Sequence, residues 1–301
     1  MKNTGKVMAL LLLTPVSVLA GVLLTVENDF VFHTDQSYTH GTELAWQEEG
    51  ITNALEFGIR MRMYSPIDTG CATNQPGDRP WAGITTVFYD WYYMGGIGDR
   101  VKMDIEVGVL GPDSMNDEAQ TFIHKIIGSR TPMGWSNQVP NEPAANITME
   151  RRLDVFTIGA KDGFSLGGEA LYGGTVGTTF DNTKVGGEIK TGWRVPQEWS
   201  CGINPKLSRD MFSSISGYAF AGADGMLVLH NATLGHSFFR CDDSKWDRDV
   251  NLGVWEAWWG LGASWRGFSA KWVLERRSEE FAGQPSLTHW GMITLGFGAS
   301  F

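Results

Sequence analysis

The chain has no long apolar run beyond its first twenty residues, although 42% of its 301 residues are hydrophobic. A membrane-spanning helix needs about 20 consecutive apolar residues, so none is expected in the remainder. The first twenty residues carry Lys2 and Lys6, then the apolar run from Val7 to Leu13, and end on the small residue Ala20. This pattern is typical of a secretory signal peptide. We therefore predict a signal peptide at residues 1–20 and one mature domain at residues 21–301.

Basic residues and cysteines are also scarce. The chain has 24 Lys and Arg against 34 Asp and Glu, a formal net charge of −10, which argues against nucleic acid as a partner. Three cysteines in an exported protein leave one unpaired. If Cys71 and Cys241 lie in outer loops and Cys201 lies on the opposite side, only the first two can meet. A disulfide between them is therefore a hypothesis.

The C-terminal segment bears on the choice between a soluble exported protein and a membrane barrel. In "WGMITLGFGASF", Ile293, Leu295, Phe297, Ala299 and Phe301 alternate with small or polar residues, which predicts a strand with one lipid-facing side. Such a strand, ending on an aromatic residue, is typical of bacterial outer-membrane barrels. The 38 Gly and 13 Trp also favour a membrane barrel, because barrels use Gly where the backbone bends and Trp where the wall meets the headgroups. A soluble secreted β-sandwich is the alternative.

Strand-like segments recur along the chain between turn signals. We predict about twelve strands, the first at residues 23–32 and the last at residues 290–301. An even number returns both ends to the periplasmic side of a single-chain barrel. Long connections fall mostly on one side, which should be extracellular, and the long segment 196–214 is the exception. The sequence thus predicts an all-β fold, a transmembrane antiparallel β-barrel of about 12 strands with a short helix in an extracellular loop.

That helix is expected at "DSMNDEAQTFIHKIIGS", residues 113–129. Ser114 and Asp117 resemble a capping box at its start, and Gly128 is a fitting end. Residues four apart share one face of a helix, so Gln120 and His124 should lie one turn apart on the same side. We take His124 as the candidate general base, although a lone histidine on a short helix is more often packed or solvated than catalytic.

A second group of polar residues lies near the top of the first predicted strand, in "ENDFVFHTDQSYTHG". Asn28 and Asp29, with backbone carbonyls, offer the oxygen ligands that suit a hard cation such as Ca²⁺, and such an ion would assist ester hydrolysis by a base-activated water. Alternatively, His33, Asp35 and His40 could ligate zinc. Because Asn28 and Asp29 are adjacent, we expect either a bulge there or a position above the hydrocarbon, beneath a lid formed by the helix. No G-x-S-x-G elbow marks a nucleophilic serine.

These motifs together resemble the lipid A 3′-O-deacylase family (LpxR type) of Gram-negative outer membranes. The matching segments are "ENDFVFHTDQSYTHG", "RMYSP", "GDRPWAG", "VGVLGPDSMNDEAQTFIHKIIGSRTPMGWSNQ" and the strand pair around "EFAGQ". The resemblance spans residues 27–301. It implies an outer-membrane carboxylic ester hydrolase that removes the 3′-linked acyloxyacyl group of lipid A, using Ca²⁺ and a histidine-activated water.

The resemblance also assigns residues by motif. Asn28 and Asp29 match the asparagine and aspartate needed for activity, and they are the candidate metal ligands. Thr39, in "YTHG", matches the active-site threonine, and His124 matches the general base. Gln120 matches a glutamine one turn before that histidine, with a supporting role.

Two positions depart from the family's pattern. The family's Lys-Arg pair in the second outer loop, placed to meet lipid A phosphates, is matched by "IDTGCATNQPGD", with no basic residue before Arg79. We expect Arg79 to pair with Asp78 or a loop carbonyl rather than with lipid. His40 stands where a small polar residue is expected.

The implied partner is lipid A or lipopolysaccharide in the outer leaflet, and the chain is expected to act as a monomer. Two other functions remain open. One is a non-enzymatic structural or transport barrel, whose acidic loop merely binds cations. The other is an outer-membrane phospholipase, which should have an activated serine.

Overall fold

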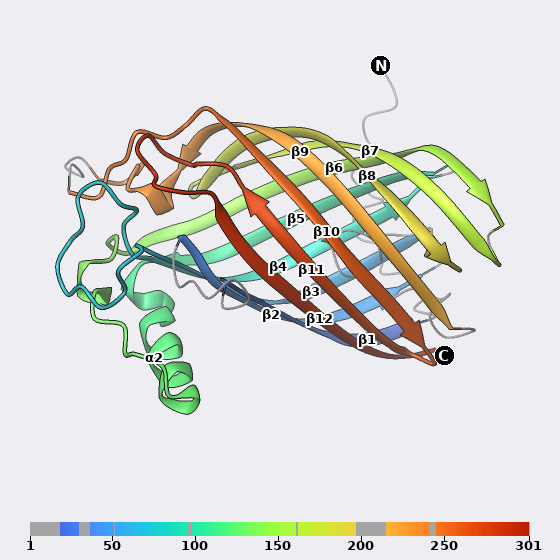
Figure 1. Cartoon of the computed structure of the whole chain (residues 1–301), viewed down its shortest axis with the longest axis horizontal. Coiled ribbons are helices and arrows are strands. Elements are labelled where there is room, and N and C mark those ends of the chain that lie inside the picture. The colour runs from blue at the N-terminus through green and yellow to red at the C-terminus, as the bar shows by residue number, and fades with distance from the viewer. Residues whose placement is uncertain are drawn as a thin grey trace, which may run out of the picture.

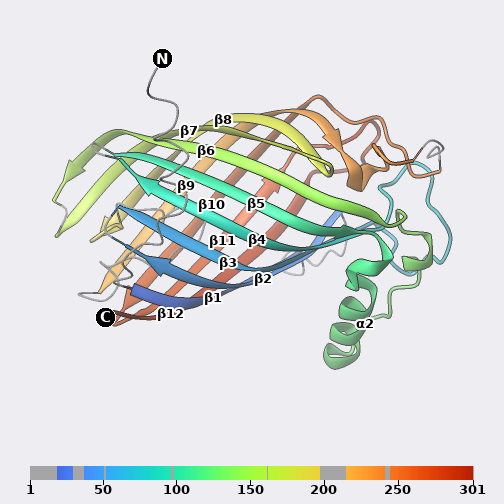
Figure 2. The ribbon, with the colours of Figure 1, turned by 180° about the vertical axis from the view of Figure 1, so that it is seen from behind.

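The computed structural model describes residues 19–29, 37–50, 52–95, 98–160, 162–196, 215–240 and 245–300. Within these residues, twelve antiparallel strands form a closed barrel in which each strand pairs with its sequence neighbours and β1 pairs with β12 (Figure 1 and Figure 2). The strands are β1 (Leu19–Asn28), β2 (Ser37–Glu49), β3 (Asn53–Ser65), β4 (Ala82–Met94), β5 (Asp99–Leu110), β6 (Glu142–Gly159), β7 (Phe164–Gly177), β8 (Phe180–Trp193), β9 (Ser216–Asn231), β10 (Gly253–Trp265), β11 (Phe268–Arg277) and β12 (Thr288–Ser300). The predicted barrel is confirmed, and the soluble sandwich is wrong because the sheet closes on itself.

The first strand begins four residues earlier than the sequence predicted. β1 begins at Leu19, not at residue 23, because it pairs with β12 without interruption from Leu19 opposite Ser300 to Asn28 opposite Gly291. Residues 1–18 lie outside the described part of the chain, so the signal peptide stays a prediction. The long segment 196–214 does not alter the strand count, since β8 and β9 pair directly with each other.

The barrel carries its longer described connections at one end, which we take as the extracellular end by the rule for bacterial barrels. The β5–β6 connection there holds three helices, η3 (Pro112–Ser114), α2 (Asn116–Ile127) and η4 (Trp135–Asn137), and the β9–β10 connection begins with η5 (Ala232–Leu234). None of the helices in the described ranges is long and apolar enough to cross a bilayer.

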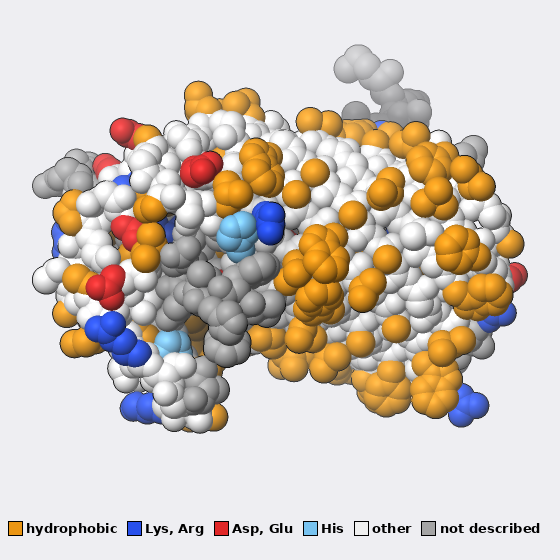
Figure 3. Space-filling view, in the orientation of Figure 1, with side chains coloured by type: hydrophobic (Ala, Val, Ile, Leu, Met, Phe, Trp, Pro, Cys, Tyr) orange, Lys and Arg blue, Asp and Glu red, His pale blue; other side chains and the backbone are white. Residues whose placement is uncertain are grey.

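Side chains alternate between lipid and lumen along the strands, as a membrane barrel requires. The outward-facing Leu44 and Val87 are 55% and 60% exposed, and hydrophobic side chains are spread over the wall in Figure 3. Charged residues that line the lumen form ion pairs there, such as Arg60 with Glu43 at 2.6 Å. The lumen also contains a cavity of about 370 Å³ whose walls carry many of these charges.

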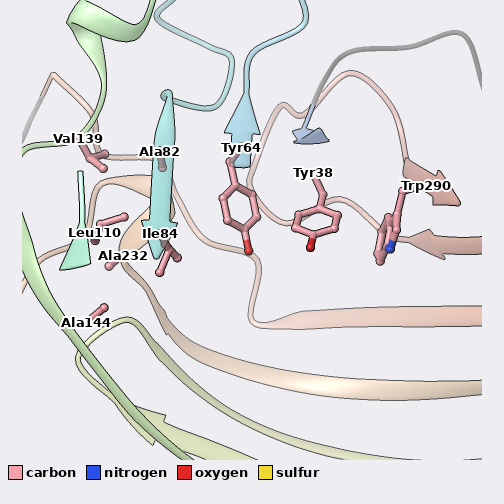
Figure 4. Packing of buried hydrophobic residues seen from close by; sticks show 9 residues of the cluster. All are labelled: Tyr38, Tyr64, Ala82, Ile84, Leu110, Val139, Ala144, Ala232 and Trp290. Atoms are coloured by element: carbon pink, nitrogen blue, oxygen red, sulfur yellow. The ribbon is translucent and has the colours of Figure 1, made fainter. Parts of the chain in front are cut away.

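Hydrophobic side chains and an ion pair fill the lumen at the extracellular end. The rings of Tyr38, Tyr64 and Trp290 lie side by side there (Figure 4), with Tyr38 5.3 Å from Tyr64 and 5.2 Å from Trp290. Above them, the fully buried side chain of Arg79 pairs with Glu280 at 2.9 Å. Three loops are thereby tied together, since Arg79 also donates to the hydroxyl of Thr233 in η5 at 3.0 Å.

The structure corrects two expectations about the loops. Only the backbone N–H of Arg79 bonds to Asp78, at 2.7 Å, because the side chain is drawn into the buried pair with Glu280. Cys71 is a free cysteine with its Sγ 3.3 Å from the Thr73 hydroxyl, so the bridge that we considered is not formed here. Its expected partner Cys241 and the third cysteine, Cys201, lie outside the described residues.

Candidate active site

Asn28 and His40 lie next to each other on the outer wall of the barrel, near its extracellular end. They are cross-strand partners in the β1–β2 ladder. Asn28 continues the outward series of Val26, which is 38% exposed, and His40 continues that of Leu44. The intervening side chains point the other way, because Glu27 lines the lumen cavity. The pair therefore faces the lipid side of the wall.

Hydrogen bonds fix the tautomer of His40. The side-chain amide nitrogen of Asn28 lies 3.2 Å from the Thr39 carbonyl oxygen and 3.3 Å from Nδ1 of His40. An amide nitrogen can only donate, so Nδ1 is the acceptor and the ring proton is on Nε2. That Nε2 lies 2.7 Å from the hydroxyl of Thr42, to which it donates. His40 is thus a neutral ring with both nitrogens engaged, and it holds Asn28 in place.

Thr39 occupies a β-bulge between Tyr38 and His40, where the β2–β3 register shifts. Bulges re-aim side chains and are common beside active sites. Thr39 is buried, and its hydroxyl bonds to the hydroxyl of Ser65. Ser65 belongs to the segment "RMYSP" but was not predicted as a site residue; only the shared motif pointed to it.

Gly41 explains the rest of the "YTHG" motif. The hydroxyl of Tyr38 donates to the carboxylate of Glu27 on the lumen side. A Cβ at position 41 would lie 2.2 Å from that hydroxyl oxygen and 2.8 Å from the Glu27 carboxylate. The motif therefore spans the wall, with its Tyr and Gly on the lumen side and its Thr and His on the site side.

Asp29 follows the last residue of β1 and is only 1% exposed. Of the two expectations for Asn28 and Asp29, the bulge is wrong, because both ladders of β1 are regular up to Asn28; the position above the hydrocarbon beneath the helix stays a prediction. Because the strand ends at Asn28, the in-and-out alternation of strand side chains does not fix the direction of Asp29. The bulge lies on the neighbouring strand β2, at Thr39.

The oxygen atoms of Asn28 and Asp29 can be compared with the ligands that a metal ion prefers. A buried carboxylate at Asp29, the amide oxygen of Asn28 and neighbouring backbone carbonyls are ligand types that suit a hard cation such as Ca²⁺. No group of three or more His, Cys, Asp or Glu side chains within the described ranges could hold a metal ion. His33 and Asp35, which the zinc alternative requires, lie outside the described residues.

Helix α2 projects outward from the extracellular end of the barrel, where it contacts β3 and β4 (Figure 1 and Figure 2). Its first residue, Asn116, donates to the hydroxyl of Thr85 at 3.2 Å, and Thr85 donates to the carbonyl of Ser114 at 2.7 Å. The predicted capping box is wrong, because the left-handed Met115 (φ 59°) separates Ser114 from the helix and no side chain caps its start. The predicted end at Gly128 is confirmed, with φ 73°.

Two tryptophans anchor the helix to the wall. Met63, Trp81 and Trp135 form a buried cluster against which Ala119 packs, with the two indole rings 4.9 Å apart. Trp135 donates from Nε1 to Oε1 of Gln120 at 2.7 Å. This bond ties α2 at Gln120 to the buried cluster. The sequence did not indicate that Trp135 is the partner of Gln120.

His124 presents an available basic nitrogen at this site. Its Nδ1 lies 2.6 Å from the carbonyl oxygen of Arg130, and because a carbonyl only accepts, Nδ1 carries the proton. The lone pair is then on Nε2, which forms no hydrogen bond to any residue in the described ranges. This is the arrangement of an oriented general base. His124 and His40 are close enough to interact electrostatically.

The structure thus gathers the predicted residues into two groups on one wall. Asn28, Asp29 and Thr39 belong to the wall, and Gln120 and His124 lie one turn apart on α2. His40 lies between them, because it bonds to Asn28 and lies near His124. The site lies on the outer face, outside the lumen.

Comparisons with known proteins bear on the family and the fold. The family model described as outer membrane protein LpxR matches residues 8–299. The structure of LpxR from Salmonella typhimurium superposes with a TM-score of 0.80 at 20% sequence identity, covering 92% of this chain and 99% of that chain. The β domain of the Bordetella autotransporter BrkA gives a TM-score of 0.41 at 11% identity, covering 94% and 98%. No curated protein matches by sequence.

The superposition at this identity supports the barrel fold, and the family match extends over nearly the whole sequence. The chain therefore belongs to the LpxR family of outer-membrane lipid A deacylases.

Proposed function

We propose that this protein hydrolyses the 3′-linked acyloxyacyl ester of lipid A, with a water molecule activated by His124. One observation carries the proposal. A histidine with a protonated Nδ1 and an available Nε2 lies on α2, near His40, which is the hydrogen-bond partner of Asn28 on the outer wall of the barrel. A lipid of the outer leaflet reaches that face by lateral diffusion, without leaving the membrane.

Each residue of the site has a separate role in the proposed reaction. His124 accepts a proton from water at Nε2, and the resulting imidazolium is stabilised by the Arg130 carbonyl at Nδ1. Gln120, held by Trp135, sets the position of the helix and hence of the base. Asn28 is oriented by the Thr39 carbonyl and by His40, and Thr39 is fixed by Ser65.

Ca²⁺ is the cofactor that the donor set suits, and Asn28 and Asp29 would hold it. When bound, it would polarise the ester carbonyl and stabilise the oxyanion that forms on it.

The rival functions are less well supported. A transport barrel would need an open path, but Arg79, Glu280 and the ring cluster fill the extracellular end of the lumen. A serine-dependent phospholipase would need a serine beside the base. The hydroxyl of Ser65 bonds to Thr39 and that of Ser114 accepts from Asn116, and neither bonds to His124 in the structure.

The test is mass spectrometry of lipid A from cells that produce the wild-type chain or His124→Ala, with calcium present. We expect the 3′-linked acyloxyacyl mass to be lost only with the wild type. Heat-modifiable migration of His124→Ala on gels should show that its barrel is folded and inserted. Deacylation by the folded variant would refute the mechanism, and intact lipid A with both proteins would refute the substrate.

A further inference from the structure

Arg276 and His289 form an outward-facing basic pair on the lipid side of the barrel. They are cross-strand partners in the β11–β12 ladder. Their neighbours Glu275, Arg277 and Trp290 line the lumen cavity, so alternation turns Arg276 and His289 outward.

The height of Arg276 on the wall puts it at the level of the headgroups. It lies eight residues along β11 from Phe268, which is 58% exposed at the periplasmic end. At about 3.3 Å per residue and a usual strand tilt, that distance is about 20 Å of height, close to the far edge of a lipid-facing band about 25 Å tall. The outward-facing Trp255, 43% exposed, stands near this edge on β10, as tryptophans do at the interface.

Arg276 has no acidic partner among the residues that the structure describes. Its sequence neighbour Arg277 points into the lumen and pairs with Glu256 at 2.5 Å. Arg276 itself is exposed, and no acidic side chain in the described ranges forms an ion pair with it. An arginine on the lipid face is costly inside the hydrocarbon and much less so at the interface, where its natural counter-ions are the anionic groups of lipids.

The pair also adjoins the candidate active site. Gly291, two residues from His289 on the same face of β12, is the cross-strand partner of Asn28. Side chains in such diagonal positions are about 7–8 Å apart. Among the described residues, a ligand that reaches from Asn28 to Arg276 crosses Gly291, which has no side chain to obstruct it, and the ring of His289.

We propose that Arg276, with His289 beside it, binds a phosphate group of the lipid that occupies the site at Asn28 and His124. The planar guanidinium suits a phosphate through two parallel hydrogen bonds. This proposal rests on the proposed lipid substrate, and it adds a contact that would fix which part of the headgroup lies over β11 and β12.

The experiment measures binding without turnover, using the full chain carrying His124→Ala in detergent micelles. Native mass spectrometry would compare phosphorylated lipid A with the same lipid after removal of its phosphates. Adding Arg276→Gln should weaken binding of the phosphorylated lipid by about ten- to hundredfold, the usual value of a charge-assisted contact. Binding of the dephosphorylated lipid should not change.

Arg266→Gln is the matched control, because Arg266 is an exposed arginine in the periplasmic turn between β10 and β11, at the other end of β11 from Arg276. It should leave both affinities unchanged. Equal loss of both lipids in Arg276→Gln, or no loss, would overturn the proposal. Displacement of the lipid by millimolar inorganic phosphate would assign the site to a free anion instead. Because hydrolysis is absent from this assay, its result stands apart from the test of deacylation.

Discussion

The hydrogen bond between Trp135 and Gln120 allows a quantitative test of how α2 is held against the barrel. A 12-residue helix is marginal on its own in water, so its persistence depends on docking. Both residues are buried, at 3% exposure each. Replacing Trp135 with Phe keeps an aromatic ring in the cluster but removes the indole N–H that donates to the Gln120 oxygen. Loss of such a buried hydrogen bond costs about 1–3 kcal/mol.

Trp81→Phe supplies the control for the lost ring. Trp81 lies in the same cluster, 4.9 Å from Trp135, but its Nε1 has no hydrogen-bond partner in the described part of the structure. The two variants therefore remove similar indole groups, and the difference between them isolates the bond to Gln120. We expect α2 to open about 5- to 150-fold more often in Trp135→Phe than in Trp81→Phe.

The assay is amide hydrogen exchange of the purified barrel, followed over the later residues of α2, because the first four N–H groups of a helix lack intrahelical partners. Trp135→Phe combined with Gln120→Met should return the exchange rate towards that of Trp81→Phe, since both polar atoms are then absent. Equal exchange in the two single variants would refute the idea that this bond positions the helix.

Two further predictions concern the wall and the loops. In Gly41→Ala, the new Cβ would lie 2.2 Å from the Tyr38 hydroxyl, so we expect a destabilisation of about 1–3 kcal/mol. It should appear as a lower unfolding midpoint on heat-modifiability gels. Gly225→Ala is the control and should be neutral, because nothing lies within 4 Å of a Cβ there. Burial raises the pKa of Glu280, but nearby guanidinium groups, Arg79 first, outweigh it, so the pKa lies below the ordinary 4.5. The loop contacts should therefore be intact above pH 4.5 and be lost as the pH falls through the lowered pKa, which pepsin cleavage of the loops would report. In Glu280→Gln, the loops should be cleaved by proteases already at neutral pH. Equal cleavage of the wild type and this variant would count against the role of the Arg79–Glu280 pair.

The family resemblance found the main catalytic candidates, but several residues that hold them could not be read from the sequence. His40 looked only like a departure from the motif, yet it orients Asn28 across the ladder. Trp135 gave no sign of its bond to Gln120, fifteen residues earlier. The Arg130 carbonyl, which sets the tautomer of His124, is a backbone atom that no pattern marks. Each of these contacts depends on how a loop folds back.

The sequence by itself determined the barrel, its twelve strands and the two faces of its wall, because a strand repeats every two residues and the lipid accepts only one kind of side chain. It also located the helix to within a few residues, since helical periodicity is local. Only the tertiary structure decided that the bulge lies at Thr39 rather than beside Asn28, and that α2 packs outside the barrel. Strand register, loop packing and buried partners such as Arg79 and Glu280 join residues far apart in the chain, and the closure of the barrel, rather than any local pattern, brings them together.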